Sequence, residues 1–518
     1  MPIRMKRFLS NHWKAGLTLL FGLAVFLFWR FRYPFVLSYQ EQFQLFLFDG
    51  DYFCERLSEP GGLARYIGEF LVQFYNSVTL GAAILSVLHM LVQQLTWQVM
   101  KPVGDSWYAL SFIPILTVWY ALGDENVLLT YVVALILALV AVWLYPKHKY
   151  VRWACLVVLV PLLYWLIGPM VLLVAACLMP WPLAIVGVLY ALACIFLSAH
   201  LLPFPIERLM VGIGYYRFPV TLPYVLMAIP VVVFALRFVG LIRVKASVAK
   251  VGAGLSLAVL LTAVLLIPRG FEARKYELIE YDYLVRLNDW NAIIAKAERK
   301  SPDLPMSVSA LNLALGMTNQ LGERALDFYQ HGSEGLLPRF ERNFTTAQVT
   351  GEIYFHLGLV NTAQRFAFES MESLPNYNKS ARVVKRLAET NLINGQYDVA
   401  RKYLQMLEKT VFYRPWARRM MALLGNEEAI NAHPLYGWLR EVRLEDDFLF
   451  SEDELDKICG QLFMHNQQNA MAMQYLVMAP LLDGDAQRFV NYLAYVQSKV
   501  KYNPRYVREA VAKIRRER

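Results

Sequence analysis

Cysteine is scarce in this chain of 518 residues, and no two cysteines are spaced as a pair. None shows the CxxC or Cys/His spacing of structural zinc sites and dithiol redox sites. Three lie inside apolar runs, where a thiol behaves as a small core side chain. The sequence therefore excludes a zinc-ribbon or thioredoxin-like protein, and it predicts no disulfide. The five cysteines are Cys54, Cys155, Cys177, Cys194 and Cys459.

Charged residues are also scarce, and this scarcity is confined to the first half of the chain. Only 18% of the residues are charged while 57% are hydrophobic, which is too apolar for a soluble protein of this size. Residues 1–267 hold 18 basic and 10 acidic side chains, whereas residues 268–518 hold 33 and 31. About +8 of the net charge of +10 thus belongs to the apolar half, so the basic balance does not indicate nucleic acid binding. We predict an all-α protein, with a polytopic transmembrane helical domain over 1–267 and a soluble helical domain over 268–518.

Long apolar runs in the first half predict about nine membrane spans. A helix needs about 20 residues to cross the hydrocarbon core. The segment 152–179 reads either as one helix or as two short helices broken at Gly168-Pro169, because proline removes a backbone hydrogen bond. The clear runs are 15–33, 70–94, 107–122, 127–145, 183–200, 219–237 and 250–267.

Lysine and arginine decide the orientation, because they accumulate on the cytoplasmic side of a membrane. If 152–179 forms two spans, most basic loop residues lie on the same side of the membrane as the N-terminus. If it forms one span, the four basic residues from Arg237 to Lys250 lie on the opposite side. We therefore expect nine spans, a cytoplasmic N-terminus on an uncleaved first span, and a second domain outside the cytoplasm.

This topology places nine of the ten carboxylates of the apolar half outside. Asp49 and Asp51 flank a glycine in the first external loop, while Asp124 and Glu125 stand in the short second loop. Carboxylates serve as general bases, and hard cations such as Mg²⁺ or Mn²⁺ prefer oxygen ligands. We predict that Asp49 and Asp51 are catalytic and that Asp124 and Glu125 bind a divalent cation. The alternative is structural, because aspartate and asparagine are ordinary turn residues.

The external loop at 201–218 supplies the only basic residues of the later external loops, Arg208 and Arg217. The planar guanidinium suits phosphate, and a neighbouring tyrosine ring can stack against a sugar. We predict that Arg208, Arg217 and Tyr215 bind substrate. The alternative for the tyrosine is the aromatic belt at the membrane interface.

The layout of residues 1–267 resembles the GT-C superfamily of membrane glycosyltransferases, which use polyprenyl-phosphate sugars. The likeness is specific at Glu41, Asp49 and Asp51, and weaker at Asp124 and Glu125. It implies that Asp49 or Asp51 activates an acceptor hydroxyl and that Arg208 or Arg217 holds the carrier phosphate. The tail lacks a WWDYG-like signature, which argues against an oligosaccharyltransferase.

The second half resembles tetratricopeptide repeats. Gly358 and Gly395 are 37 residues apart, and Ala363 and Ala400 each follow five residues later, with Pro375 closing the first copy. Glycine ends a first helix and a small alanine allows two helices to approach closely. The resemblance implies an α-helical solenoid that binds a protein or peptide partner.

The order of spans followed by repeats also resembles uncharacterised membrane proteins of the Bacteroidota type, which implies a bacterial inner membrane and a periplasmic second domain. Two hypotheses follow: a transferase using a lipid-linked sugar, or a non-catalytic scaffold that recruits cell-envelope proteins. A transporter is disfavoured because almost no ionisable residue falls within a span.

Overall fold

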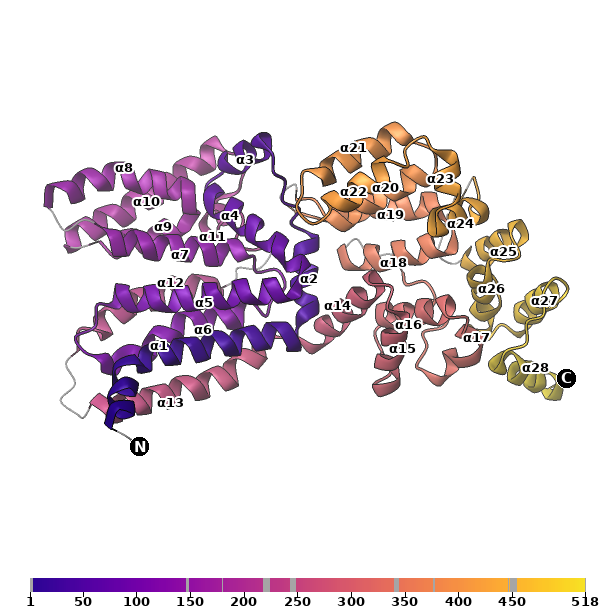
Figure 1. Cartoon of the computed structure of the whole chain (residues 1–518), viewed down its shortest axis with the longest axis horizontal. Coiled ribbons are helices and arrows are strands. Elements are labelled where there is room, and N and C mark those ends of the chain that lie inside the picture. Colours follow the sequence, from indigo (N-terminus) through magenta and orange to yellow (C-terminus); the bar gives the residue numbers. More distant parts are fainter. Residues whose placement is uncertain are drawn as a thin grey trace. The chain divides into compact units, whose positions relative to one another are not determined.

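The computed structural model describes residues 3–145, 149–178, 180–217, 224–242, 248–339, 344–375, 378–445, 447 and 454–517, and its course is drawn in Figure 1. The chain divides into two compact units, Met1–Ala273 and Arg274–Arg518. Within the described ranges every regular element is a helix, and extended pairing is limited to isolated bridges such as Val127 with Tyr216. The all-α prediction is confirmed for these residues.

The first unit is built from helices of very unequal length. They are α1 (Ile3–Leu27), η1 (Phe28–Arg32), α2 (Pro34–Gln42), α3 (Gly50–Leu57), α4 (Gly62–Val72), η2 (Gln73–Asn76), α5 (Val78–Met100), η3 (Asp105–Phe112), α6 (Ile113–Ala121), α7 (Leu129–Leu144), α8 (Lys149–Ile167), η4 (Gly168–Met170), α9 (Val171–Ala176), α10 (Trp181–Leu201), α11 (Ile206–Val211), α12 (Tyr224–Val239), α13 (Val248–Leu266) and η5 (Ile267–Gly270).

Five helical runs among the described residues are long and apolar enough to cross a membrane. This supports membrane association of the first unit. The predicted span 70–94 begins later than expected, at Val78, because charged α4 forms a separate helix before it. The predicted spans 127–145 and 219–237 correspond to shorter apolar helices, α7 and α12, and the start of the latter lies outside the described residues. The five runs are Trp13–Arg32, Val78–Met100, Leu156–Ala176, Trp181–Leu201 and Lys250–Gly270.

The run Leu156–Ala176 is interrupted where the sequence indicated. Gly168 has φ +63°, a left-handed conformation that favours glycine, and the chain reverses there. Both Leu156 in α8 and Ala175 in α9 approach Gly187 of α10, so after the reversal both pieces pack against this helix (Figure 1). The break between α8 and α9 is therefore present in the fold.

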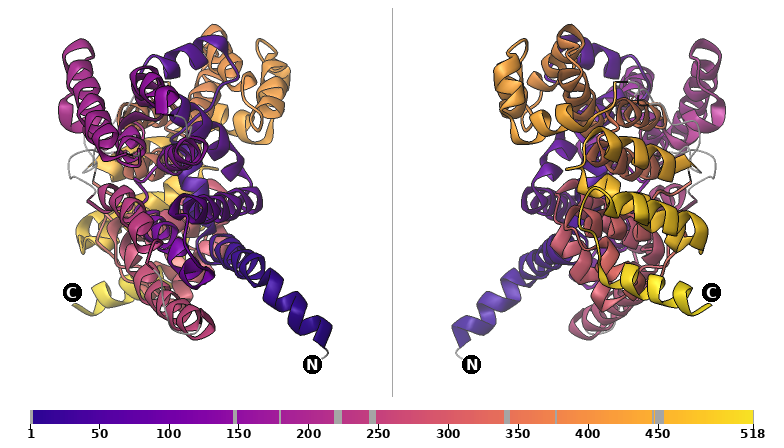
Figure 2. Two further views of the ribbon diagram at one scale, coloured as in Figure 1. Left: turned by 90° about the vertical axis from the view of Figure 1, so that its left-hand side faces the viewer. Right: turned by 90° about the vertical axis from the view of Figure 1, so that its right-hand side faces the viewer.

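Polar side chains join α1 to α5 inside the first unit. Gln93 accepts a hydrogen bond from the Thr18 hydroxyl (2.9 Å) and donates one to Ser111 (2.7 Å). Ser86 donates to the carbonyl of Gly22 at 2.7 Å. Such bonds hold helices together where the surroundings are apolar. Beyond them, the N-terminal end of α1 projects from the bundle (Figure 2).

The second unit consists mainly of antiparallel helix pairs. Its elements are α14 (Ala273–Arg286), α15 (Trp290–Arg299), α16 (Pro305–Met317), α17 (Leu321–Arg324), η6 (Ala325–Asp327), α18 (Phe344–Leu357), α19 (Val360–Glu372), α20 (Ala381–Ile393), α21 (Tyr397–Glu408), α22 (Arg414–Met421), α23 (Glu427–Asn431), α24 (Pro434–Val442), α25 (Leu455–His465), α26 (Ala470–Leu482), α27 (Ala486–Gln497) and α28 (Arg505–Glu517).

Two consecutive hairpins share one construction. Gly358 (φ +98°) follows α18 and Gly395 (φ +74°) follows α20. Ala363 in α19 and Ala400 in α21, the second helices of the two hairpins, are fully buried. Glycine therefore ends the first helix of each hairpin, and alanine allows the second to pack closely against it.

The C-terminal helices pack back onto the first helices of the same unit. Gln474 of α26 donates to the carbonyl of Gly316 (3.2 Å) and accepts from the backbone N–H of Leu321 (3.2 Å). In α28, the backbone N–H of Arg505 donates to Glu323 at 3.1 Å. These contacts depart from a simple solenoid, in which each repeat touches only its neighbours.

Candidate functional site

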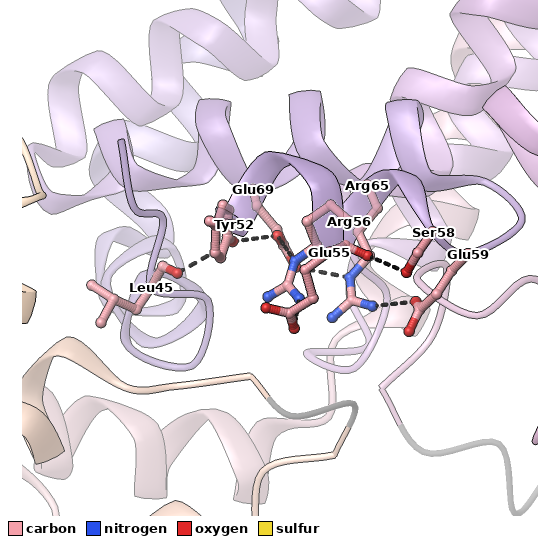
Figure 3. A network of polar contacts seen from close by, with 8 residues as sticks. All are labelled: Leu45, Tyr52, Glu55, Arg56, Ser58, Glu59, Arg65 and Glu69. Carbon is pink, nitrogen blue, oxygen red and sulfur yellow. Dashed lines mark hydrogen bonds and ion pairs between the residues drawn. The ribbon is translucent and has the colours of Figure 1, made fainter. Parts of the chain in front are cut away.

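A buried ionic cluster lies between α3 and α4 in the first unit (Figure 3). Glu69 accepts hydrogen bonds from Tyr52 Oη (2.5 Å), Arg56 Nε (2.7 Å) and Arg65 Nε (3.0 Å). The side chains of Glu69, Arg56 and Arg65 are at most 5% exposed. A carboxylate held by two guanidinium groups and a phenol is fully satisfied despite burial.

Two further carboxylates complete the cluster from its exposed side. Glu55 pairs with Arg56 Nη1 (2.9 Å), and Glu59 pairs with Arg65 Nη1 (2.7 Å). Burial alone raises the pKa of Glu69, but the charges of Arg65 and Arg56 offset burial and hold the pKa below its ordinary value. The cluster is therefore ionised, and both of its arginines already bind carboxylates.

The local sequence explains how α3 and α4 meet. Gly61 has φ +86°, and a Cβ at Gly62 would lie 2.1 Å from the carbonyl oxygen of Arg56, so this glycine pair permits the tight approach. Trp165 of α8 anchors the turn, because its indole donates to Leu57 O (2.7 Å) and its carbonyl accepts from Gly61 N (2.8 Å). The hairpin is thereby fixed to the end of α8.

The predicted catalytic residues lie at the start of α3. Asp49 is the N-cap residue, and Asp51 is exposed in the first turn. Asp51 and Glu55 are four residues apart, so they share one face of the helix. Asp51 therefore belongs to the exposed acidic edge of the cluster rather than to its buried centre.

The predicted metal residues belong to a loop that pairs with the end of the 201–218 loop. Asp124 Oδ1 accepts from the backbone N–H and the amide of Asn126, both at 2.9 Å, and Oδ2 accepts from Tyr216 Oη at 2.8 Å. Glu125 accepts from the same amide at 3.2 Å. The backbone N–H of Arg217 donates to Asn126 O at 2.8 Å. The structure therefore brings Asp124, Glu125 and Arg217 together.

The two predicted ligands of the substrate in this segment point in different directions. The Arg217 guanidinium lies 4.3 Å from the ring centre of Phe43 and donates to Tyr39 Oη at 3.3 Å. Tyr215 is buried and donates to the carbonyl of Ile167. Tyr215 therefore ties the loop to the end of α8.

Arg208 lies apart from Arg217, on α11, close to the ionic cluster. Burial and the positive charge of Arg65 lower the pKa of Arg208, while Glu59 raises it. Its Nη2 atom is buried and has no hydrogen-bond partner among the described residues. Arg208 therefore has donor capacity that Arg56 and Arg65 lack.

An apolar groove begins at the same short helix. It has a volume of about 330 Å³, and Met210 and Val211 of α11 contribute to its wall. Most of the remaining wall comes from α9, α10 and α12, for example Leu173, Leu192 and Val231. Tyr215, a predicted substrate ligand, also lines the groove. A groove of this size and lining fits an apolar chain. Arg208 belongs to the same short helix as Met210 and Val211 but does not itself line the groove.

Sequence reasoning did not single out Arg56, Arg65 and Glu69. The signal was present, because charged residues in an otherwise apolar segment are costly and usually paired, and Arg65 and Glu69 have the spacing of a helical ion pair. The partners on α3 could not be assigned, because they depend on the turn at Gly61-Gly62.

The described residues contain no group of three or more His, Cys, Asp or Glu side chains placed to hold a metal ion. Asp124 and Glu125 supply fewer ligands than a hard cation takes, and their oxygens already accept hydrogen bonds. The cation site stays a prediction.

Comparison with known proteins identifies a family. No curated protein and no solved structure matches the chain. The model of a family of unknown function, DUF6057, matches residues 11–517. With nearly its whole length matched, the chain belongs to this family.

Proposed function

We propose that this protein is a membrane transferase that takes a sugar from a polyprenyl-phosphate carrier at the outer face of the bacterial inner membrane. The observation that carries the proposal is that one short helix, α11, holds both Arg208, whose buried Nη2 atom has no hydrogen-bond partner among the described residues, and two residues that line the apolar groove, Met210 and Val211. The polyprenyl chain would lie against Met210 and Val211, and the phosphate would accept hydrogen bonds from Arg208. The planar guanidinium of Arg208 suits such an anionic group.

The proposed reaction is a displacement at the sugar. The oxygen of an acceptor hydroxyl forms a bond to the anomeric carbon, and the bond between that carbon and the carrier phosphate oxygen breaks. The electron pair leaves with the phosphate, which Arg208 stabilises. The hydroxyl proton passes to Asp51 or Asp49, the carboxylates at the start of α3. Arg217, which lies apart from Arg208, is the alternative phosphate ligand, and no step depends on a metal.

The proposed topology has nine spans, with the N-terminus in the cytoplasm and the second unit in the periplasm. The reversal at Gly168 supports two passes within 152–179. In that arrangement α3, α4, α11 and the loop at Asp124 share the periplasmic end of the bundle. A lipid-linked substrate would then enter from the outer leaflet.

The test uses full-length protein in proteoliposomes that contain a polyprenyl-phosphate sugar. We expect Asp51→Asn to abolish transfer without lowering membrane abundance, because an amide cannot accept the proton. We expect Arg208→Ala to weaken carrier binding about tenfold or more, since hydrogen bonds to charged groups contribute roughly 1.5–3 kcal/mol. Glu207→Gln is the matched control, because Glu207 is the exposed neighbour of Arg208 on α11. Unchanged carrier binding by the Arg208 variant would contradict the proposal.

A scaffold is the second candidate function. Its support is the shared construction of the α18–α19 and α20–α21 hairpins, which fits a tetratricopeptide-like surface for a protein partner. A scaffold predicts that Asp51→Asn and Arg208→Ala leave the phenotype of the cell envelope unchanged. Substitutions on the exposed faces of α19 and α21 would then abolish it.

A further inference from the structure

A second apolar groove lies elsewhere in the first unit and has no part in the proposed reaction. It has a volume of about 480 Å³. Its walls come from α1 and α13, and its floor from η3 and α6, including Phe112 and Trp119. Both wall helices belong to candidate membrane spans. The groove therefore runs along the bundle at the depth of the hydrocarbon core.

The rim of this groove is open to the surroundings of the bundle. Leu20 on α1 is 65% exposed, and Leu260 and Val264 on α13 are 59% and 62% exposed. Apart from the Ser256 hydroxyl, every side chain lining the groove is apolar. A hydrocarbon chain is the ligand chemistry that suits such a surface in a membrane.

One end of the groove carries positive charge. Phe28, Ile267 and Pro268 line this end. Arg30 and Arg32 lie in η1, and Arg269 lies in η5. Contacts of Phe271 with Phe28 (5.2 Å between ring centres) and Tyr33 (4.7 Å, stacked) hold η1 and η5 together. Three arginines therefore belong to the two short helices at which the groove ends.

Unlike the lysine near the other end of α1, these arginines have no acidic partner among the described residues. None of the three forms an ion pair with a described residue, and Arg32 and Arg269 are exposed. By contrast, Lys14 pairs with Asp105 at 2.5 Å. Uncompensated basic residues at the membrane surface attract anionic headgroups.

We propose that the groove between α1 and α13 binds an anionic phospholipid, with an acyl chain against Phe112 and Trp119 and the headgroup phosphate at Arg30, Arg32 and Arg269. Charge complementarity selects this occupant over a zwitterionic lipid or an apolar helix of a partner protein. The site is separate from Arg208, and it does not depend on the proposed transferase activity.

Native mass spectrometry tests the proposal on the full chain released from detergent. The probes are phosphatidylglycerol and phosphatidylcholine with identical acyl chains, at equal concentration. We expect the protein to retain phosphatidylglycerol preferentially. The preference should fall roughly fivefold for each arginine removed in Arg32→Ala and Arg269→Ala. Ala263→Trp, which fills the groove, should reduce retention of both lipids.

Two controls locate the effect. Lys250→Ala removes a basic residue from the opposite end of α13 and should leave the preference unchanged. Arg208→Ala, which reports anionic lipid held at the other groove, should leave the effects of Arg32→Ala and Arg269→Ala unchanged. Equal retention of the two lipids by the unmodified protein would overturn the proposal. So would a preference that survives the loss of Arg32 and Arg269 but disappears with Arg208.

Discussion

Tyr52 Oη lies 2.5 Å from Glu69 Oε2, and this contact joins α3 to α4. The same oxygen of Glu69 accepts from Arg56 at 2.7 Å, and the other oxygen accepts from Arg65 at 3.0 Å. Because the carboxylate is 2% exposed, its partners replace the water it has lost. The hairpin that carries Asp51 therefore depends on one buried charge.

Removing that charge is expected to destabilise the first unit strongly. Glu69→Ala leaves Arg56 and Arg65 buried without their shared carboxylate, at a cost of about 3–5 kcal/mol. Tyr52→Phe removes one hydrogen bond to a charged group, about 1.5–3 kcal/mol. Thermal unfolding in detergent should give a lower melting temperature for Glu69→Ala than for Tyr52→Phe. Glu55→Ala is the control, because this carboxylate also pairs with Arg56 but is 58% exposed. If Glu55→Ala lowered the stability as much as Glu69→Ala, burial of the carboxylate would not be the cause of the loss.

An ion pair in the second unit offers an independent case. Arg382 lies 2.8 Å from Asp282 and 3.2 Å from Glu352, and its side chain is 8% exposed. Arg382→Ala leaves two buried carboxylates without this partner, so we expect a loss of about 3–5 kcal/mol. Lys300→Ala breaks the pair with Glu277, in which the lysine is 79% exposed, and should hardly change the stability because solvent screens exposed ion pairs. Comparing the melting temperatures of the two variants in the full chain checks this prediction.

The two hairpin glycines should respond unequally to alanine. Both have positive φ, which costs a residue with a side chain about 1 kcal/mol. A Cβ at Gly358 would also meet Val442 Cγ2 at 2.9 Å, whereas the nearest atom at Gly395 is 3.9 Å away. We expect Gly358→Ala to lower the melting temperature more than Gly395→Ala. Equal effects would mean that the backbone conformation alone determines the cost.

Acidification should destabilise the second unit through His356. Burial lowers the pKa of His356 from 6.5 to about 4, even though Glu352 acts to raise it. The unfolded chain therefore binds a proton there at higher pH than the folded chain. The contribution of neutral His356 to the free energy of unfolding is fully present above pH 6.5. This contribution, about 3 kcal/mol, is lost as the pH falls toward 4. The effect of Glu352 follows at lower pH, because Arg386 and Arg382 offset its burial and hold its pKa at about 2, below the ordinary 4.5.

The measurement is the melting temperature of the full chain across this range, for the unmodified protein and for His356→Gln. The difference between the two should change between pH 6.5 and 4, because the glutamine cannot take up the proton. A difference that is independent of pH would contradict the assignment to His356.

The sequence by itself determined the class of the protein. Long apolar runs and the separation of charge at about residue 268 predict membrane helices followed by polar helices, because hydropathy and helical periodicity are local properties. The break at Gly168 and the hairpin ends at Gly358 and Gly395 were also readable, since glycine marks positions that need positive φ.

Tertiary structure alone decided which charged residues meet. Arg208 comes under the influence of Arg65 only because α11 and α4 pack at the same end of the bundle. Tyr52 and Glu69 meet only because two glycines allow a tight turn. Likewise, Asp124 is held by Tyr216 across more than ninety intervening positions. The energy of a buried ion pair depends on distance and desolvation, which no local sequence pattern encodes.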